Sequence, residues 1–296
     1  MTRTVDMPAF GPEARAGRVE DGGAAMDGVT VTLVGAGKMA EALIAGWLRT
    51  ATLTPRQIRA GNRRDRRRLR RLAGRYGVVT ATRKARLLDG ADVVVLAVKP
   101  ADAAAAMAEA APYLTRRQVV VSVMAGVRLA RLAEGLGGHR NLVRAMPNTS
   151  CSLAAGATAL CPGPDCDPHA VDLARRLFDP LGVTVDVSED LFDAVTAVSG
   201  SGPAYVYLLA EAVIDAARAL GLSDQAARLL TAQTILGAGR MLLGEGADPA
   251  ELRRRVTSPG GTTAAALAVL EEAGTAAQLH QAVQQAAARS AELAHS

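Results

Sequence analysis

Short apolar runs alternate with segments of helical periodicity between residues 29 and 187. The run over residues 92–98, bounded by Gly90 and Pro100, is typical of a strand buried on both faces of a parallel sheet. Strands that alternate with helices predict an α/β fold with a doubly wound parallel sheet. Strands are predicted over residues 29–34, 57–60, 77–80, 92–98, 119–123, 141–145, 157–160 and 183–187, and helices over 39–48, 65–75, 129–136 and 168–179.

The pattern changes after Ser188, where strand signals stop and Ala and Leu recur at helical spacing. We therefore expect an α/β domain over residues 27–188 and an all-α domain over 189–296. Residues 1–26 show no apolar pattern and are expected to form a disordered tail, which leaves Met26 as an alternative start of translation. Helices are predicted over residues 203–220, 224–244 (capped by Ser223), 249–256, 262–272 and 275–294.

The helical domain has few aromatic residues and therefore a thin core of its own. Small domains of this kind often gain stability by oligomerisation. We expect an obligate homodimer in which the long helix over 203–220 packs against its partner through one apolar side, formed by Tyr205, Leu208, Leu209, Ala212 and Val213.

Charge and composition exclude several classes of protein. The 34 basic and 29 acidic residues give a net charge of +5, which does not by itself imply a nucleic-acid partner. Eight arginines lie between Arg63 and Arg75, but no aromatics stand between them for base stacking, so a solvated helix face is favoured. No apolar run approaches the ~20 residues of a membrane span, and the N-terminus does not resemble a signal peptide. We expect a cytoplasmic protein with neither a membrane nor a nucleic-acid partner.

The three cysteines are expected to be free thiols of a reducing compartment, and no metal site is predicted because none of them lies at zinc-ligand spacing from a histidine. Lysine is equally rare in this arginine-rich chain. Lys38, Lys84 and Lys99 are its only lysines, which makes each of them a candidate for a specific role.

The string Gly35-x-Gly37-x-x-Ala40 joins the first strand to the first helix, which is the context of a dinucleotide-binding turn in a Rossmann-type fold. Gly35 allows the tight turn, Gly37 lets the backbone approach a pyrophosphate, and Ala40 permits close packing of helix and strand. A tight turn without a ligand is the simpler alternative.

The end of the second strand indicates which dinucleotide is bound. NAD enzymes usually carry an acidic residue there for the ribose 2′-hydroxyl, whereas this chain has Asn62-Arg63-Arg64. A guanidinium can bind a 2′-phosphate through paired hydrogen bonds. The sequence therefore favours NADP(H), with NAD(H) as an alternative; Asp65 comes too late for the ribose and is expected to cap the next helix.

Four further strings lie where ligands bind or helices begin. Val98-Lys99-Pro100 and residues 144–149 end predicted strands, and residues 199–204 and 256–263 open predicted helices. Taken alone, Lys99 is also consistent with a surface lysine, 148–149 with a turn and 199–204 with a simple cap. The last string combines hydroxyls with Gly260-Gly261 at a helix N-terminus, an arrangement suited to a carboxylate.

Together these strings resemble the pyrroline-5-carboxylate reductase family over about residues 29–293. The matching motifs are GAGKMA, AVKP, SVMAGV, RAMPNT, GSGPA and VTSPGGTT, in the family's order. The resemblance implies that NADPH or NADH reduces 1-pyrroline-5-carboxylate to L-proline, the last step of proline biosynthesis. It also implies an interlocked homodimer and, in some members, a decamer made of five dimers.

By the same resemblance, each predicted site takes its residues from these motifs. Ser258 and Thr263 are the catalytic candidates, Thr263 bonding the ring nitrogen and Ser258 ordering its loop. The substrate-binding set is Ser258, Gly260, Gly261, Thr262 and Thr263. The cofactor-binding set is Gly35, Ala36, Gly37, Lys38, Met39, Ala40, Asn62, Arg63, Ala97, Val98, Lys99, Pro100, Met124, Ala125 and Gly126.

Three positions depart from the family pattern: Ser150 stands where a proline is common, and Lys84 and Arg255 stand where asparagines are common.

Two rival functions share the architecture. A β-hydroxyacid dehydrogenase would need a lysine on the helix over 203–220, which has none, and a regulatory NADP-binding module would leave residues 258–263 without a role.

Overall fold

The computed structural model describes residues 26–244 and 246–295, so the predicted tail lies outside the described residues apart from Met26. The described chain forms two compact units. The first, which we call the sheet unit, comprises residues 26–202 and 282–295, and the second, the helical unit, comprises 203–244 and 246–281. Met26 is buried in the sheet unit, where its carbonyl accepts a hydrogen bond from Gln57 Nε2 at 2.6 Å.

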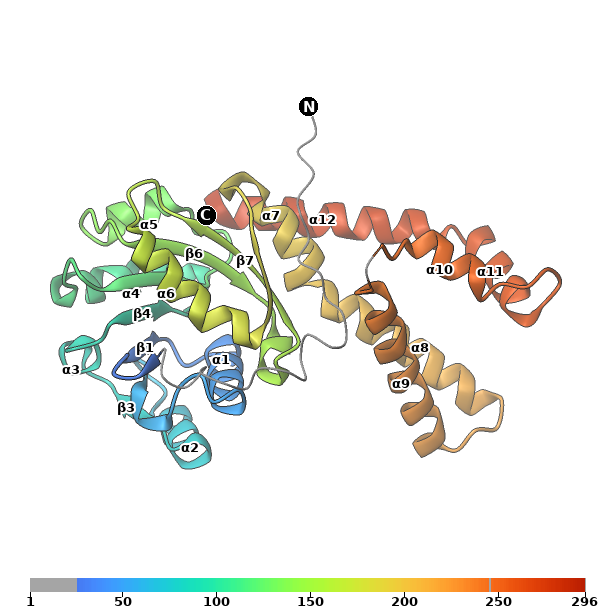
Figure 1. Cartoon of the computed structure of the whole chain (residues 1–296), viewed down its shortest axis with the longest axis horizontal. Helices are drawn as coiled ribbons and strands as arrows, with labels where there is room; N and C mark the ends of the chain where they lie inside the picture. Colours follow the sequence, from blue (N-terminus) through green and yellow to red (C-terminus); the bar gives the residue numbers. More distant parts are fainter. Residues whose placement is uncertain (1–25, 245, 296) are drawn as a thin grey trace. The chain divides into compact units, whose positions relative to one another are not determined.

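The sheet unit is built on an eight-stranded sheet in the order β3-β2-β1-β4-β5-β6-β7-β8 (Figure 1). Every strand overlaps a segment predicted from the sequence, and the predicted α/β fold class is confirmed. The strands are β1 (Val31–Val34), β2 (Ile58–Gly61), β3 (Val79–Ala81), β4 (Val93–Leu96), β5 (Val119–Ser122), β6 (Leu142–Pro147), β7 (Gly156–Pro162) and β8 (Gly182–Asp186).

The direction of the last two strands differs from the fully parallel sheet predicted. β1 to β6 are parallel, whereas β7 is antiparallel to β6, and β8 is parallel to β7. The physical reason is the length of the connection between β6 and β7, which consists of the 3-10 helix η6 (Thr149–Leu153) and its flanking residues. A parallel crossover needs a dozen residues or more, and this connection is too short for one.

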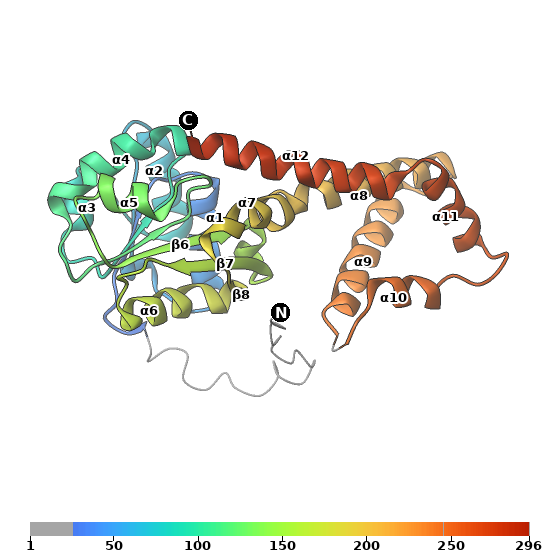
Figure 2. The same ribbon diagram turned by 90° about the horizontal axis from the view of Figure 1, so that it is seen from above.

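Helices cover both faces of the sheet, as the continuous apolar strands predicted. Val93 and Val95 of β4 pack with α1 (Lys38–Arg49), α2 (Arg66–Tyr76) and α6 (Pro168–Phe178). Val94 and Leu96 point to the other face, where α3 (Lys84–Leu88), α4 (Ala103–Ala110) and α5 (Leu129–Gly135) lie. Figure 2 shows α6 on the opposite side of the sheet from α4 and α5.

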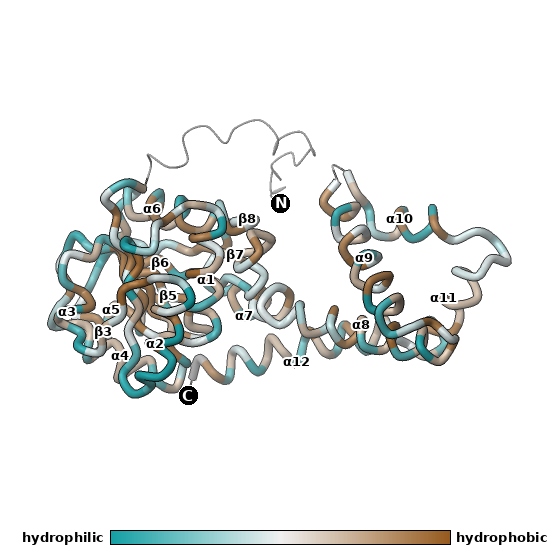
Figure 3. Tube along the Cα trace, turned by 90° about the horizontal axis from the view of Figure 1, so that it is seen from below, coloured by the Kyte–Doolittle hydropathy of each residue, from teal (hydrophilic) through white to brown (hydrophobic). Residues whose placement is uncertain are grey.

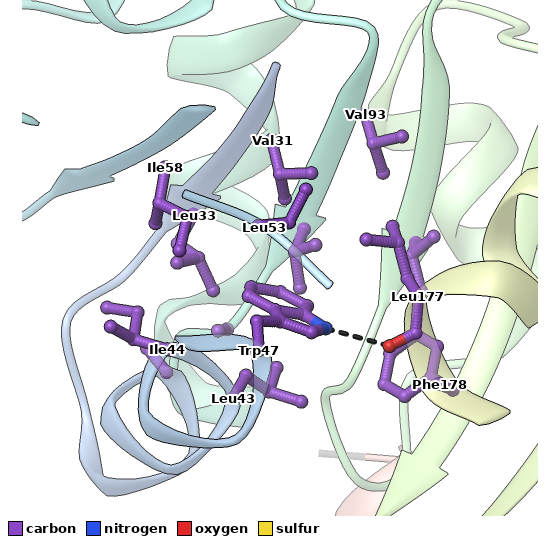
Figure 4. Close-up of a cluster of buried hydrophobic side chains, with 14 of the residues drawn as sticks. Val31, Leu33, Leu43, Ile44, Trp47, Leu53, Ile58, Val93, Leu177 and Phe178 are labelled. Atoms are coloured by element: carbon purple, nitrogen blue, oxygen red, sulfur yellow. Dashed lines mark hydrogen bonds between the residues drawn. The ribbon is translucent and has the colours of Figure 1, made fainter. Parts of the chain in front are cut away.

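Trp47 is the largest side chain of the first of these two cores and is fully buried. Its indole N–H donates a hydrogen bond of 2.7 Å to the carbonyl of Leu177 on α6 (Figure 4). A buried indole N–H without a partner would cost free energy, so this bond satisfies the one polar atom that α1 brings into the core. It also holds α1 against α6, and with it the glycine turn that precedes α1.

The helical unit is formed by α8 (Gly202–Ala219), α9 (Asp224–Leu242), α10 (Pro249–Arg255), α11 (Thr262–Glu272) and the first part of α12 (Thr275–His295). Local signals are confirmed here, since Ser223 caps α9 by accepting a hydrogen bond from Ala226 N at 3.3 Å. Of the side chains described in this unit, only Ala227 and Thr231 are buried. Figure 3 shows hydrophobic positions along α8 and α9.

Large apolar side chains of the helical unit are therefore exposed in a single chain. Leu208 and Leu209 of α8 are 69% and 57% exposed, and Leu229 of α9 is 66% exposed. Several large exposed apolar side chains on neighbouring helices are typical of an interaction surface. The continuous helix Glu189–Ala219 is also long and apolar enough, by length and composition alone, to cross a membrane.

Candidate active site

A cavity of about 340 Å³ opens at the carboxyl ends of β1, β2 and β4. In open α/β sheets this edge, next to the point where strand order reverses, is where ligands bind. The strand order places the reversal between β1 and β4. The cavity is lined by Gly35, Ala36, Gly37, Gly61, Asn62, Arg63, Arg64, Lys84, Ala97, Val98, Lys99, Asp102, Ala105, Ala106 and Glu109.

The two glycines of the turn have different structural roles. Gly35 has a φ of +113°, and a Cβ there would come within 2.4 Å of the Ala97 carbonyl oxygen, so the fold itself requires glycine. Gly37 has an extended backbone that any residue can adopt, and a Cβ there would meet nothing closer than Ala97 O at 3.8 Å. The space over Gly37 belongs to the cavity, at the N-terminus of α1, where a helix favours an anion.

We expect Gly37→Ala to weaken dinucleotide binding about tenfold or more, which corresponds to ~1.4 kcal/mol. The added methyl group occupies the space into which the pyrophosphate must fit, while the fold loses nothing. Calorimetric titration with NADPH measures the first effect, and thermal unfolding should shift by less than about 2 °C. Gly35→Ala is the contrasting variant, since it should lower the unfolding temperature; a Gly37→Ala protein that binds NADPH normally would contradict this assignment.

Charged side chains of α1 and α2 form ion pairs with one another next to the glycine turn, and one of them also bonds the turn. Arg68 donates through Nε to the Ala36 carbonyl and through Nη2 to Glu41 Oε2 at 2.9 Å. Arg71 and Arg75 also pair with Glu41. These arginines had been predicted to form a solvated face; Arg71 and Arg75 are mostly exposed, whereas Arg68 is mostly buried and bonds the Ala36 carbonyl of the glycine turn. Their convergence on one acidic residue of α1 was not predicted.

The end of β2 provides polar groups and cations to the cavity. The side-chain oxygen of Asn62 accepts hydrogen bonds from the backbone of Arg64 and Asp65 at 3.0 and 3.1 Å, which leaves its amide nitrogen as the donor. Asp65 caps α2, as predicted, by accepting from Arg68 N at 2.8 Å. Arg63 is half-exposed and forms an ion pair of 3.0 Å with Glu109.

The other predicted cofactor residues lie on neighbouring elements of the same unit. Ala97, Val98 and Lys99 line the cavity, and Pro100 begins the next 3-10 helix, η4 (Pro100–Asp102). Residues 124–126, which are Met124, Ala125 and Gly126, follow β5 at the same edge of the sheet. The remaining residues of the turn belong to α1: Lys38 lines a separate hollow along that helix, and Met39 and Ala40 follow it.

Asn148, at the end of β6, has a structural role in the described chain. Its Oδ1 accepts a hydrogen bond from Ser150 N at 3.2 Å, and its Nδ2 donates to the carbonyl of Ser199 at 3.3 Å. Ser199 lies in a π-helical turn, η9 (Thr196–Gly200), directly before α8. The Asn148 side chain therefore joins the end of β6 to the start of the long helix.

The predicted substrate residues form one compact turn in the helical unit. Ser258 O accepts a hydrogen bond from Gly261 N at 3.0 Å, with Pro259 and Gly260 between them. Gly260 has a φ of +70°, as the third position of a type II turn requires. Gly261 is the N-cap of α11, so the amides of Thr262 and Thr263 belong to the unbonded first turn of that helix. The turn thus presents free amides and hydroxyls to an anion.

Cysteine chemistry has no support at this site. Burial raises the pKa of Cys151 to about 12 and that of Cys166 to about 11, which keeps both as weakly nucleophilic thiols at neutral pH. All three cysteines are free, as predicted. Within residues 26–244 and 246–295, no three His, Cys, Asp or Glu side chains gather as they would around a metal ion.

Known proteins share both parts of this arrangement. Residues 189–293 match the family model described as pyrroline-5-carboxylate reductase dimerisation, and residues 30–126 match one described as NADP oxidoreductase, coenzyme F420-dependent. The chain is 43% identical to the pyrroline-5-carboxylate reductase of Pseudomonas aeruginosa over 89% of its own length and 96% of that protein. It belongs to the pyrroline-5-carboxylate reductase family.

Solved structures of family members agree in fold. The Plasmodium falciparum pyrroline carboxylate reductase with NADP bound has a TM-score of 0.83 at 27% identity, covering 91% of this chain and 99% of that one. The Coxiella burnetii enzyme has a TM-score of 0.79 at 38% identity, covering 90% and 98%. The sequence resemblance to pyrroline-5-carboxylate reductases is confirmed, and the exposed apolar face of α8 and α9 lies in the segment matched to the family's dimerisation model.

Proposed function

We propose that this chain is an NAD(P)H-dependent oxidoreductase that reduces the C=N bond of 1-pyrroline-5-carboxylate to L-proline, the last step of proline biosynthesis. The observation that carries the proposal is the presence of both a dinucleotide-sized cavity and a Ser258–Thr263 turn in a chain that matches pyrroline-5-carboxylate reductases over nearly all of its described length. NADP(H) is the preferred cofactor, because four of the six charged residues that line the cavity are Arg or Lys. NAD(H) is an alternative.

The residues of the cavity fit a dinucleotide. Gly37 leaves room for a pyrophosphate at the N-terminus of α1, and Arg63 and Lys84 line the same cavity and would bind the adenosine ribose. When bound, the reduced nicotinamide supplies the hydride for the imine carbon. The protein contributes binding, orientation and electrostatics.

The turn at the start of α11 would hold the other reactant. The unbonded amides of Thr262 and Thr263 and the helix dipole suit the substrate carboxylate, and Gly260 and Gly261 leave room for it to approach. The Thr263 hydroxyl would accept a hydrogen bond from the protonated ring nitrogen, which orients the iminium and stabilises its proton. Ser258 would keep the turn closed by packing against Gly261. Its Oγ is so close that a Cβ added to Gly261 would lie only 2.4 Å from it. No carboxylate or imidazole is needed, because the iminium brings its own proton.

Steady-state kinetics with 1-pyrroline-5-carboxylate test the activity directly, and comparison of NADPH with NADH tests the cofactor preference.

We expect Arg63→Gln to lower kcat/KM for NADPH about tenfold and to change that for NADH less than about threefold, since a charged hydrogen bond is worth roughly 1.5–3 kcal/mol. The exposed Arg66 of α2 is the matched control, because it does not line the cavity. Absence of imine reduction with either nucleotide would refute the proposed reaction.

The proposed assembly is a homodimer formed through the helical unit. Assembly of five dimers into a decamer, a cytoplasmic location and the absence of a membrane partner stay predictions. Sedimentation of the purified full chain distinguishes a dimer from a decamer, and sedimentation with and without lipid vesicles tests the membrane prediction.

A further inference from the structure

A carboxylate occupies the cationic end of the dinucleotide cavity. Glu109 Oε1 lies 3.0 Å from Arg63 Nη1, and its Oε2 lies 3.6 Å from Lys84 Nζ. The two cations come from different elements, since Arg63 follows β2 and Lys84 begins α3, while Glu109 stands near the end of α4. A single acidic side chain therefore bridges the two basic groups best placed for a 2′-phosphate.

Helix stability does not explain an acidic residue at this position. Glu109 is in the last turn of α4, where the helix dipole disfavours negative charge, and it is one residue from the C-terminus of that helix. Among the described residues, its two ion-pair partners both line the cavity. The Lys84 side chain is only 12% exposed, so a nearby countercharge offsets the cost of its burial. The Glu109 carboxylate is therefore stabilised by the cations of the cavity, whereas the dipole of its own helix destabilises it.

We propose that Glu109 sets the selectivity between NADPH and NADH by competing with the 2′-phosphate for Arg63 and Lys84. With Glu109 ionised, the trio carries a net charge of about +1; a 2′-phosphate of about −1.5 to −2 then meets a repelling carboxylate and cations that are already paired. The ribose of NADH carries only a hydroxyl there, which can donate to the carboxylate. Glu109 therefore lowers the affinity for NADPH relative to NADH and keeps the cavity open to both.

The other charged groups of the cavity do not reproduce this arrangement. Arg64 and Lys99 add positive charge, and Asp102 adds negative charge, but Asp102 has no ion pair with a cavity cation among the described residues. Glu109 is the acidic cavity residue that forms ion pairs with cations in the described structure. This inference rests on the proposed function only in that the cavity binds nicotinamide dinucleotides.

The test measures the binding of NADP⁺ and NAD⁺ to the full-length protein by calorimetry, without the imine. These ligands differ only by the 2′-phosphate. We expect Glu109→Gln to raise the ratio of NADP⁺ to NAD⁺ affinity about tenfold, mostly through tighter NADP⁺ binding, and the gain to shrink at high ionic strength. Glu109→Asp keeps the charge and should change the ratio less than about threefold. The ratio of kcat/KM values for NADPH and NADH should follow the binding ratio.

Glu134→Gln is the matched control, because Glu134 is an exposed acidic residue of α5 outside the cavity. An unchanged or lower NADP⁺ to NAD⁺ affinity ratio in Glu109→Gln would overturn the proposal and would mean that Glu109 holds the cations in place for the phosphate. An equal rise in Glu109→Asp would also overturn it, because side-chain length and not charge would then be the cause. Failure of imine reduction with a shifted binding ratio would refute the proposed reaction and leave this inference standing.

Discussion

A Thr263→Val enzyme should lose roughly 10²–10³-fold in kcat with 1-pyrroline-5-carboxylate, the scale measured for one preorganised hydrogen-bonding group. Valine has nearly the shape of threonine, so the start of α11 and its backbone amides remain in place. What is lost is the hydroxyl proposed to orient and stabilise the protonated ring nitrogen. Because that hydrogen bond orients the iminium for hydride transfer, while the backbone amides proposed to bind the carboxylate stay in place, kcat should fall more than KM rises. Single-turnover reduction monitored by NADPH absorbance separates chemistry from product release.

The control is the same substitution at Thr234, whose hydroxyl donates to the Leu230 carbonyl within α9 at 2.8 Å. Thr234→Val should keep kcat within about twofold, since loss of a local helix hydrogen bond costs little. Normal turnover by Thr263→Val would show that the hydroxyl has no part in the reaction. The substrate would then be held by the amides of the turn alone.

Replacing Arg144 by methionine should lower the free energy of unfolding of the sheet unit by about 3 kcal/mol, the lower end of the range for breaking a buried ion pair. The Arg144 side chain is only 4% exposed and lies 3.0 Å from Glu189 Oε1, with its guanidinium 4.4 Å from the centre of the Phe192 ring. Glu189 Oε1 also accepts a hydrogen bond from Leu129 N at 2.6 Å. Removing the guanidinium leaves this half-buried carboxylate without its countercharge.

Urea denaturation followed by circular dichroism measures the effect, and Arg140→Met provides the comparison. Arg140 and Asp165 form an ion pair of 3.7 Å in which both side chains are mostly exposed. Such surface pairs contribute about 0–1 kcal/mol. Equal destabilisation by the two substitutions would show that burial adds nothing to the Arg144–Glu189 pair, and that the start of the helix at Glu189 is held by other contacts.

Much of the fold could be predicted because the signals are local. The apolar runs indicated all eight strands of the sheet, and the helix caps at Asp65 and Ser223 were correct, since a cap depends on a side chain and an amide a few residues apart. The direction of β7 and β8 was wrong because it depends on the length and path of a connection, which a strand pattern does not contain.

For the candidate site, the sequence identified motifs, and the structure identified which distant side chains form ion pairs and hydrogen bonds with one another. The glycine turn and the cationic end of β2 were visible as strings, and the resemblance to one enzyme family followed from their order. Lys84 was singled out by the rarity of lysine and by its departure from the family pattern, whereas no role was predicted for Glu109. Neither residue stands in a recognisable motif, so their ion pair could not be predicted from the sequence.

By itself, the sequence determined the eight strands, most of the helices (though not α3 and α4), the place of the glycine turn, and which family the protein resembles, because each depends on residues close together in the chain. Only the tertiary structure decided that Arg63, Lys84 and Glu109 meet, and that Arg68 reaches back to Ala36. These partners are separated by 21 to 46 residues and meet because the sheet brings the ends of distant elements to one edge. The strand order therefore decides which charged side chains meet at the cavity.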